Sequence, residues 1–125
     1  MNARETRRHL FDVEKTLKEW GNDPHRRNGL FDRPPETPKH AFVKFCVWLS
    51  LRQKGHTVFT ECKDRLGRVM DLWDLETGLN YEIQLAGEKK SNADDIIITD
   101  TIVIPGDECP DKLMAALKWV ETYLT

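Results

Sequence analysis

The spacing of hydrophobic residues divides the chain into helical and extended segments. Apolar positions recur at helical intervals in three segments, which predicts helices over about residues 3–20, 37–54 and 110–123. Thr37 is a suitable N-cap for the second of these helices, and Gly55 follows its last turn. Helices are therefore expected on both sides of the extended part of the chain.

Four runs rich in β-branched and aromatic residues predict strands over about residues 57–62, 68–75, 80–85 and 96–104. The polar stretch 86–95 is too short for more than one or two helical turns. Helices before and after a group of strands indicate an α/β or α+β sandwich with a sheet of about four strands.

The second and third predicted strands flank a Thr77-Gly78 turn signal and so indicate a β-hairpin. A two-residue turn pairs Asp71 with Gln84 and places Glu82 opposite Trp73. Because side chains alternate across a strand, we expect Asp71, Glu82 and Gln84 to lie on one face. Two carboxylates this close are unfavourable unless a proton or a cation lies between them.

This acidic face predicts a site for a divalent cation. Asp71 and Glu82 are the first candidate ligands, because Mg²⁺ prefers oxygen donors. The carbonyl of Ile83 is a candidate third oxygen, and Glu61 on the preceding strand is a further candidate ligand or base. Gln84 is expected to orient a water or a phosphate. Such a cation suits phosphodiester cleavage, because it neutralises charge on phosphate oxygens and activates water.

The order of a helix, a strand with Glu61, a strand with Asp71 and then Glu82-Ile83-Gln84 resembles the PD-(D/E)xK restriction-endonuclease-like superfamily. The resemblance covers residues 36–105. It implies an αβββαβ core with a mixed sheet flanked by helices, here with an extra N-terminal helix. It also implies a Mg²⁺- or Mn²⁺-dependent nuclease that hydrolyses DNA, with the family's Asp at Asp71 and its second acidic residue at Glu82.

The chain departs from the family pattern at Gln84, where most members carry a lysine whose charge stabilises the phosphate. Lys89 or Lys90, just beyond this strand, is the natural substitute. Many members also have an acidic residue in the first core helix. Glu36, just before the predicted helix, is the acidic candidate there, although a Glu near a helix start needs no function. For His40, a surface or capping role is expected.

The charge distribution separates a basic first half from an acidic second half. Residues 1–70 contain 15 Lys/Arg and 9 Asp/Glu, whereas residues 71–125 contain 4 and 12. We expect residues 1–38 to form a helix and a basic proline-rich linker, and residues 39–125 to form the nuclease-like domain. Arg26, Arg27, Arg33 and Lys39 are the candidate nucleic-acid contacts. The alternative is that these charges only face solvent.

Two other functions fit the same residues. One is a binding module that keeps the fold without catalysis and recognises DNA, RNA or a protein partner, which Gln84 favours. The other is a homodimer formed through the N-terminal helix. Three dispersed cysteines, Cys46, Cys62 and Cys109, predict buried free thiols and a cytoplasmic location. No apolar run approaches the roughly 20 residues that span a membrane, and no export signal is visible.

Overall fold

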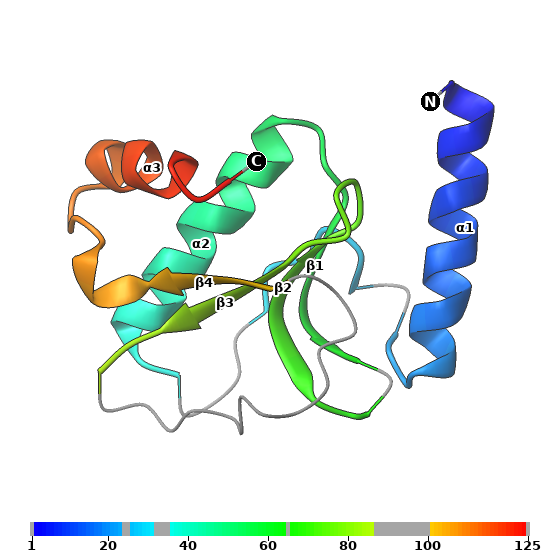
Figure 1. The fold of residues 1–125 in the computed structure, drawn as a ribbon, viewed down its shortest axis with the longest axis horizontal. Coiled ribbons are helices and arrows are strands. Elements are labelled where there is room, and N and C mark those ends of the chain that lie inside the picture. Colours follow the sequence, from blue (N-terminus) through cyan, green and yellow to red (C-terminus); the bar gives the residue numbers. More distant parts are fainter. Residues whose placement is uncertain (1, 24–25, 32–35, 65, 87–100, 125) are drawn as a thin grey trace.

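The computed structural model describes residues 2–23, 26–31, 36–64, 66–86 and 101–124. Its elements, in order along the chain, are α1 (Ala3–Glu19), α2 (Pro38–Gln53), β1 (Val58–Lys63), β2 (Val69–Asp74), β3 (Asn80–Gln84), β4 (Thr101–Pro105), the 3₁₀ turn η2 (Gly106–Glu108) and α3 (Leu113–Glu121). The predicted α/β class with a four-stranded sheet and an N-terminal helix is confirmed (Figure 1).

The four strands form one mixed sheet in the order β1-β2-β3-β4. Strand β2 runs antiparallel to both β1 and β3, and β4 runs parallel to β3. Helices α2 and α3 pack together on one face of the sheet. Helix α1 stands beside β1 and β2 on the other face (Figure 1). The described part of the chain is therefore a sheet between two helical layers.

Helix α2 builds the main hydrophobic core. Thr37 caps its start by accepting the backbone N–H of His40, and Pro38 occupies the first turn, as predicted. Helices α2 and α3 bury apolar side chains against one face of the sheet. The buried side chains of this core from the helices and the strands include Val43, Val47, Leu51, Val58, Leu72, Tyr81, Ile83, Ile104 and Val120. Helix α2 also buries two basic side chains, His40 and Lys44. Its packed side is therefore only partly apolar.

Helix α1 is fixed at its start by a capping box and along its length by a second core. Asn2 accepts the backbone N–H of Glu5 at 2.8 Å, and the Glu5 side chain accepts the Asn2 backbone N–H. Leu17 is buried against Phe59, and Trp20 stacks on Trp73 with ring centroids 5.9 Å apart. The apolar side of α1 is therefore covered by the sheet.

The hairpin between β2 and β3 differs from the prediction. Trp73 lies opposite Asn80, not Glu82, and residues 75–79 form the connection instead of a two-residue turn. Asp74 causes the difference, because its carboxylate accepts the backbone N–H of Glu76 and the hydroxyl of Thr77. The predicted register is therefore wrong by two residues. When the observed register is extended by one residue beyond Leu72↔Tyr81, Asp71 lies opposite Glu82.

The end of the sheet also differs in detail. The last helix begins at Leu113 and not at Pro110, because the backbone of Lys112, its N-cap, is extended. The first part of the predicted strand 96–104, the predicted turns in 86–95, and Lys89 and Lys90 lie outside the described residues. None of the described helices is long and apolar enough to cross a membrane.

The three cysteines are buried free thiols, as predicted. Burial raises the pKa of Cys46 to about 11 and that of Cys62 to about 12. The pKa of Cys109 is also raised by burial. All three thiols are therefore protonated at neutral pH, which makes them poor nucleophiles and poor metal ligands.

The packing of α1 can be tested with a buried and an exposed residue of the same helix. Leu17 is 1% exposed and Phe11 is 67% exposed. We expect Leu17→Ala to lower the free energy of unfolding by about 3 kcal/mol, because it opens a cavity in the second core. Phe11→Ala should change it by no more than about 0.5 kcal/mol. Urea denaturation measures both, and equal effects would contradict the packing described for α1.

Candidate functional site

The pairing of β1 with β2 is interrupted at Glu61 and Asp71. The register runs through Thr60↔Leu72 and resumes at Cys62↔Met70, without a backbone pair between them. Glu61 has a φ of +51°, a left-handed conformation that is rare for residues other than glycine. Beyond the interruption, Cys62 packs in the second core although its parity matches Val58 in the main core. The alternation of side chains therefore shifts by one residue at this point.

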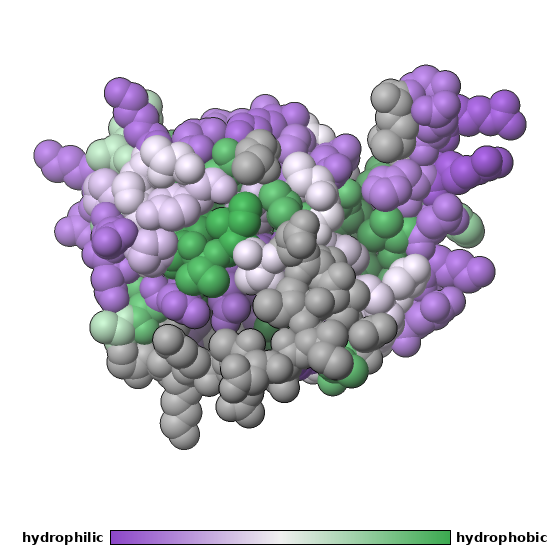
Figure 2. Space-filling model, in the orientation of Figure 1, coloured by the Kyte–Doolittle hydropathy of each residue, from purple (hydrophilic) through white to green (hydrophobic). Residues whose placement is uncertain are grey.

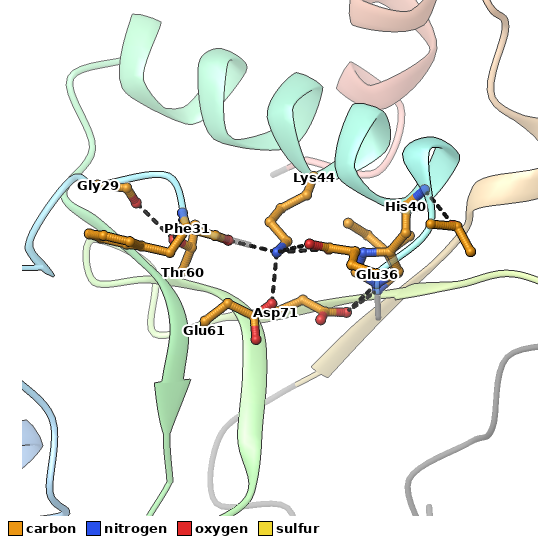
Figure 3. Close-up of polar contacts among 10 residues, drawn as sticks. Gly29, Phe31, Glu36, His40, Lys44, Thr60, Glu61 and Asp71 are labelled. Carbon is orange, nitrogen blue, oxygen red and sulfur yellow. Dashed lines mark hydrogen bonds and ion pairs between the residues drawn. The ribbon is translucent and has the colours of Figure 1, made fainter. Parts of the chain in front are cut away.

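The interruption turns Glu61 towards α2, where it meets the buried ammonium group of Lys44. Lys44 is 0% exposed. Its Nζ donates to the carbonyl of Phe31 at 2.8 Å, to Glu36 Oε2 at 3.0 Å and to Glu61 Oε1 at 2.7 Å, as Figure 3 shows. An ammonium group has three donors, so these contacts use all of them.

Lys44 stays charged in this environment. Burial would lower its pKa, but hydrogen bonds to Glu36 and Glu61 and the charges of both carboxylates raise the pKa above its ordinary value. Burial would likewise raise the pKa of Glu36, but Lys44 and His40 hold it below its ordinary value. Lys44 and Glu36 are therefore both ionised at neutral pH.

His40 connects Glu36 to Asp71. Its Nδ1 contacts Glu36 Oε1, and its Nε2 lies 3.4 Å from Asp71 Oδ2. Glu36, His40 and Lys44 are spaced four residues apart, so they follow one side of α2 and of the turn before it. We name the five side chains Glu36, His40, Lys44, Glu61 and Asp71 the buried ionic cluster (Figure 3).

Asp71 lies where β2 and β3 stop pairing. The described backbone pairs between these strands end at Leu72↔Tyr81. Just beyond, the N–H of Ile83 donates to Asp71 Oδ2 at 2.9 Å instead of to the β2 backbone. The carboxylate thereby satisfies a buried amide that the interrupted sheet would otherwise leave unpaired. Asp71 thus joins the buried ionic cluster to the backbone of β3.

The structure corrects the predicted common face of Asp71, Glu82 and Gln84. Asp71 turns towards α2 because of the interruption at Glu61. Glu82 is paired with Val103, which is 44% exposed, whereas its neighbours in β3 lie in the main core. Glu82 and Gln84 therefore belong to the other face of β3, and Asp71 adjoins them only at the gap between β2 and β3.

The candidate nucleic-acid contacts that the structure describes each interact with another group of the protein. Arg26 lies over the ring of Phe31, and Arg27 pairs with Glu14. Lys39 Nζ donates to the carbonyl of Cys109 at 2.6 Å and to Asp111 at 3.0 Å. Arg33 and Lys89 lie outside the described residues. Each of the described candidate cations therefore has a partner within the protein.

Lys44 was not predicted as a site residue, and His40 was expected to have only a surface or capping role. One signal was available for Lys44, because it lies between Val43 and Val47 in a largely apolar helix. A lysine at such a position is almost never fully buried unless it has partners. Its partners come from three separate parts of the chain, the turn before α2, β1 and the segment at Phe31.

The charges of the buried ionic cluster do not balance. Its three carboxylates and one ammonium leave a charge of −2, or −1 when His40 is protonated. In the described ranges, no group of three or more His, Cys, Asp or Glu side chains could together hold a metal ion. A hard cation here would take one or two carboxylates and fill its remaining positions with water and substrate, as Mg²⁺ commonly does.

Replacing Lys44 should lower the free energy of unfolding far more than replacing an exposed lysine. We expect Lys44→Met to lower the free energy of unfolding by about 4 kcal/mol, because it leaves buried carboxylates without their cation. Lys54→Met is the control and should cost less than about 1 kcal/mol, since Lys54 is exposed and pairs with the exposed carboxylate of Glu121. Chemical denaturation measures both variants. Equal losses would contradict the role of Lys44.

The pKa shifts predict how stability depends on pH. The lowered pKa of Glu36 contributes stability above its ordinary value of 4.5, and this contribution is lost as pH falls through the lower value in the folded protein. The raised pKa of Lys44 contributes below 10.5 and is lost only as pH rises through its higher folded value.

We therefore expect Glu36→Gln to be less stable than the wild type at neutral pH, with a difference that shrinks as pH falls below 4.5. Urea denaturation from neutral pH to about pH 3 measures this difference. The exposed Glu76→Gln serves as the matched control. A difference that stays constant across this range would show that Glu36 does not stabilise the fold through its charge.

Comparisons of the chain with models of known protein families, with curated proteins and with solved structures found no match. The residues and geometry described above are therefore the basis for assigning a function.

Proposed function

We propose that this protein is a metal-dependent phosphodiester hydrolase acting on DNA, with Asp71 as its central carboxylate. One observation supports this proposal above the others. A buried ionic cluster with three carboxylates and one ammonium ends at Asp71, in a gap between two strands where Glu82 is the next residue across. Buried ionisable groups with shifted pKa values are concentrated at functional sites, and excess negative charge attracts a cation.

Asp71, Glu82 and the carbonyl of Ile83 fit a hard cation by their donor chemistry. They are the residues that would hold Mg²⁺ or Mn²⁺, and the ion would neutralise charge on the phosphate and activate a water. Asp71 is oriented by the Ile83 N–H and by His40. Lys44 fixes Glu36 and Glu61, and its bond to Glu61 Oε1 makes this carboxylate a supporting group and not a first ligand.

The remaining predicted site residues have roles consistent with this proposal. Gln84 lies on the same face of β3 as Glu82, where its amide can donate a hydrogen bond to a phosphate oxygen or hold a water. It supplies no positive charge. The cation that the family pattern places at this position is then expected from Lys89, which lies outside the described residues.

A second function is favoured by Lys44. Its ammonium already lies between Glu36 and Glu61, where it partly neutralises the acidic cluster without a metal. Together with the missing lysine at Gln84, this favours a module that binds DNA without cleaving it. The two proposals differ in whether the carboxylate of Asp71 takes part in chemistry or only completes the sheet.

Cleavage of supercoiled plasmid separates the two functions. With Mg²⁺ or Mn²⁺, we expect the wild type to nick DNA and Asp71→Asn or Glu82→Gln to lose about a hundredfold or more in rate, because each removes charge at the reacting phosphate. Asn at position 71 can still accept the Ile83 N–H, so the fold should be retained. Glu76→Gln, which changes an exposed carboxylate of the same hairpin, should cleave like the wild type.

Equal rates for the wild type and both site variants would indicate a contaminating nuclease and reject the hydrolase. Retention of DNA by the wild type without cleavage, with or without EDTA, would support the binding module.

A further inference from the structure

The side of α1 that faces away from the sheet carries a row of cations. Positions separated by four, three, four and three residues lie on one side of a helix. In α1 these positions, all of them exposed, are Arg4, Arg8, Phe11, Lys15 and Lys18. We name them the α1 stripe. The stripe lies opposite Val13 and Leu17, which pack in the second core. Figure 2 shows hydrophilic side chains along the outer side of this helix.

Within the described part of the chain, the cations of the α1 stripe have no ionic partner. None of its four cations forms an ion pair or a side-chain hydrogen bond with another described residue. The acidic residues of the helix lie on its flanks, and one of them, Glu14, is paired with Arg27. Phe11, at the centre of the stripe, is 67% exposed. The middle of this surface therefore presents cations and one aromatic ring.

The stripe is long enough to follow a nucleic-acid backbone. At a rise of 1.5 Å per residue, Arg4 and Lys18 are about 21 Å apart, the length of about six base pairs of duplex. We propose that the α1 stripe binds the phosphate backbone of DNA, with Phe11 against the sugars or an unpaired base. The choice of DNA among polyanions rests on the proposed function.

The packing of α1 favours DNA over an anionic membrane. A helix that lies on a membrane inserts its apolar face among the lipids. In α1 this face is already buried, since Leu17 is 1% exposed and Trp20 stacks on Trp73. Phe11 alone among the stripe residues is apolar. The outward side of α1 therefore suits a polar polyanion and not a hydrocarbon layer.

The stripe and the buried ionic cluster lie on opposite sides of β1 and β2, since α1 and α2 pack on opposite faces. The stripe shares no residue with the proposed site at Asp71, Glu82 and Gln84. The α1 stripe is therefore an anchoring surface, and its loss should weaken binding without removing the chemistry at Asp71.

Binding of a fluorescein-labelled 20-base-pair duplex, followed by fluorescence anisotropy in EDTA, tests the stripe. The variant replaces Arg4, Arg8 and Lys15 by Gln. The matched control replaces Lys54, Lys112 and Lys118 by Gln, which removes the same charge from exposed positions on the side of α2 and α3. Thermal melting should show that both variants remain folded, because the changed side chains are exposed.

We expect the stripe variant to bind at least about tenfold more weakly at low salt. The slope of log K against log salt should also fall in magnitude by about 3, because three phosphate contacts are lost. The control variant should bind like the wild type. An unchanged affinity of the stripe variant, or equal losses in the two variants, would overturn the proposal. Binding to phosphatidylserine vesicles with no binding to the duplex would overturn it too.

Because EDTA suppresses metal-dependent cleavage, this result does not depend on the hydrolase. Salt-dependent binding through the stripe without any plasmid cleavage would uphold the anchoring surface and reject only the hydrolase. Plasmid cleavage by the wild type, together with unchanged binding by the stripe variant, would uphold the hydrolase and reject only the anchoring surface.

Discussion

The buried ammonium of Lys44 is the constraint on which the arrangement of the site depends. A charge with no access to solvent is tolerated only when it is fully paired, and Lys44 draws its three partners from the segment at Phe31, the turn at Glu36 and the strand at Glu61. Glu61 reaches Lys44 from a left-handed backbone conformation, which interrupts the pairing of β1 with β2. At the same interruption, the side chain of Asp71 points towards α2. One lysine thus connects a helix, a loop and a break in the sheet.

Local signals predicted most of the elements but not how the strands meet at the site. Thr37, Pro38 and Gly55 mark the ends of α2 through short-range effects, and this helix was predicted correctly. The hairpin register was wrong because the side chain of Asp74 widens the turn. The shifted alternation at Glu61 and the burial of Lys44 depend on contacts between residues that are 8 to 17 positions apart in the chain. Periodicity describes regular strands, so it does not reveal an irregular one.

Stability and proposed function draw on the same carboxylates in this protein. Glu36 and Glu61 pair with Lys44, whereas Asp71 accepts the Ile83 N–H. In the proposed metal-dependent site, Lys44 is a fixed internal cation that cannot dissociate, and it keeps Glu36 ionised and Glu61 in place. The nucleic-acid contacts proposed for α1 use none of these carboxylates. Anchoring and chemistry are therefore separable in the chain.

The two cores on opposite faces of the sheet each contain their own pair of tryptophans. Trp20 stacks on Trp73 between α1 and the sheet, whereas Trp48 of α2 and Trp119 of α3 pack against the main core. Exciton coupling between the stacked indoles of Trp20 and Trp73 depends on α1 staying in place. The chain thus carries an internal spectroscopic reporter for movement of this one helix, which near-ultraviolet circular dichroism can follow while the other two indoles report on the main core.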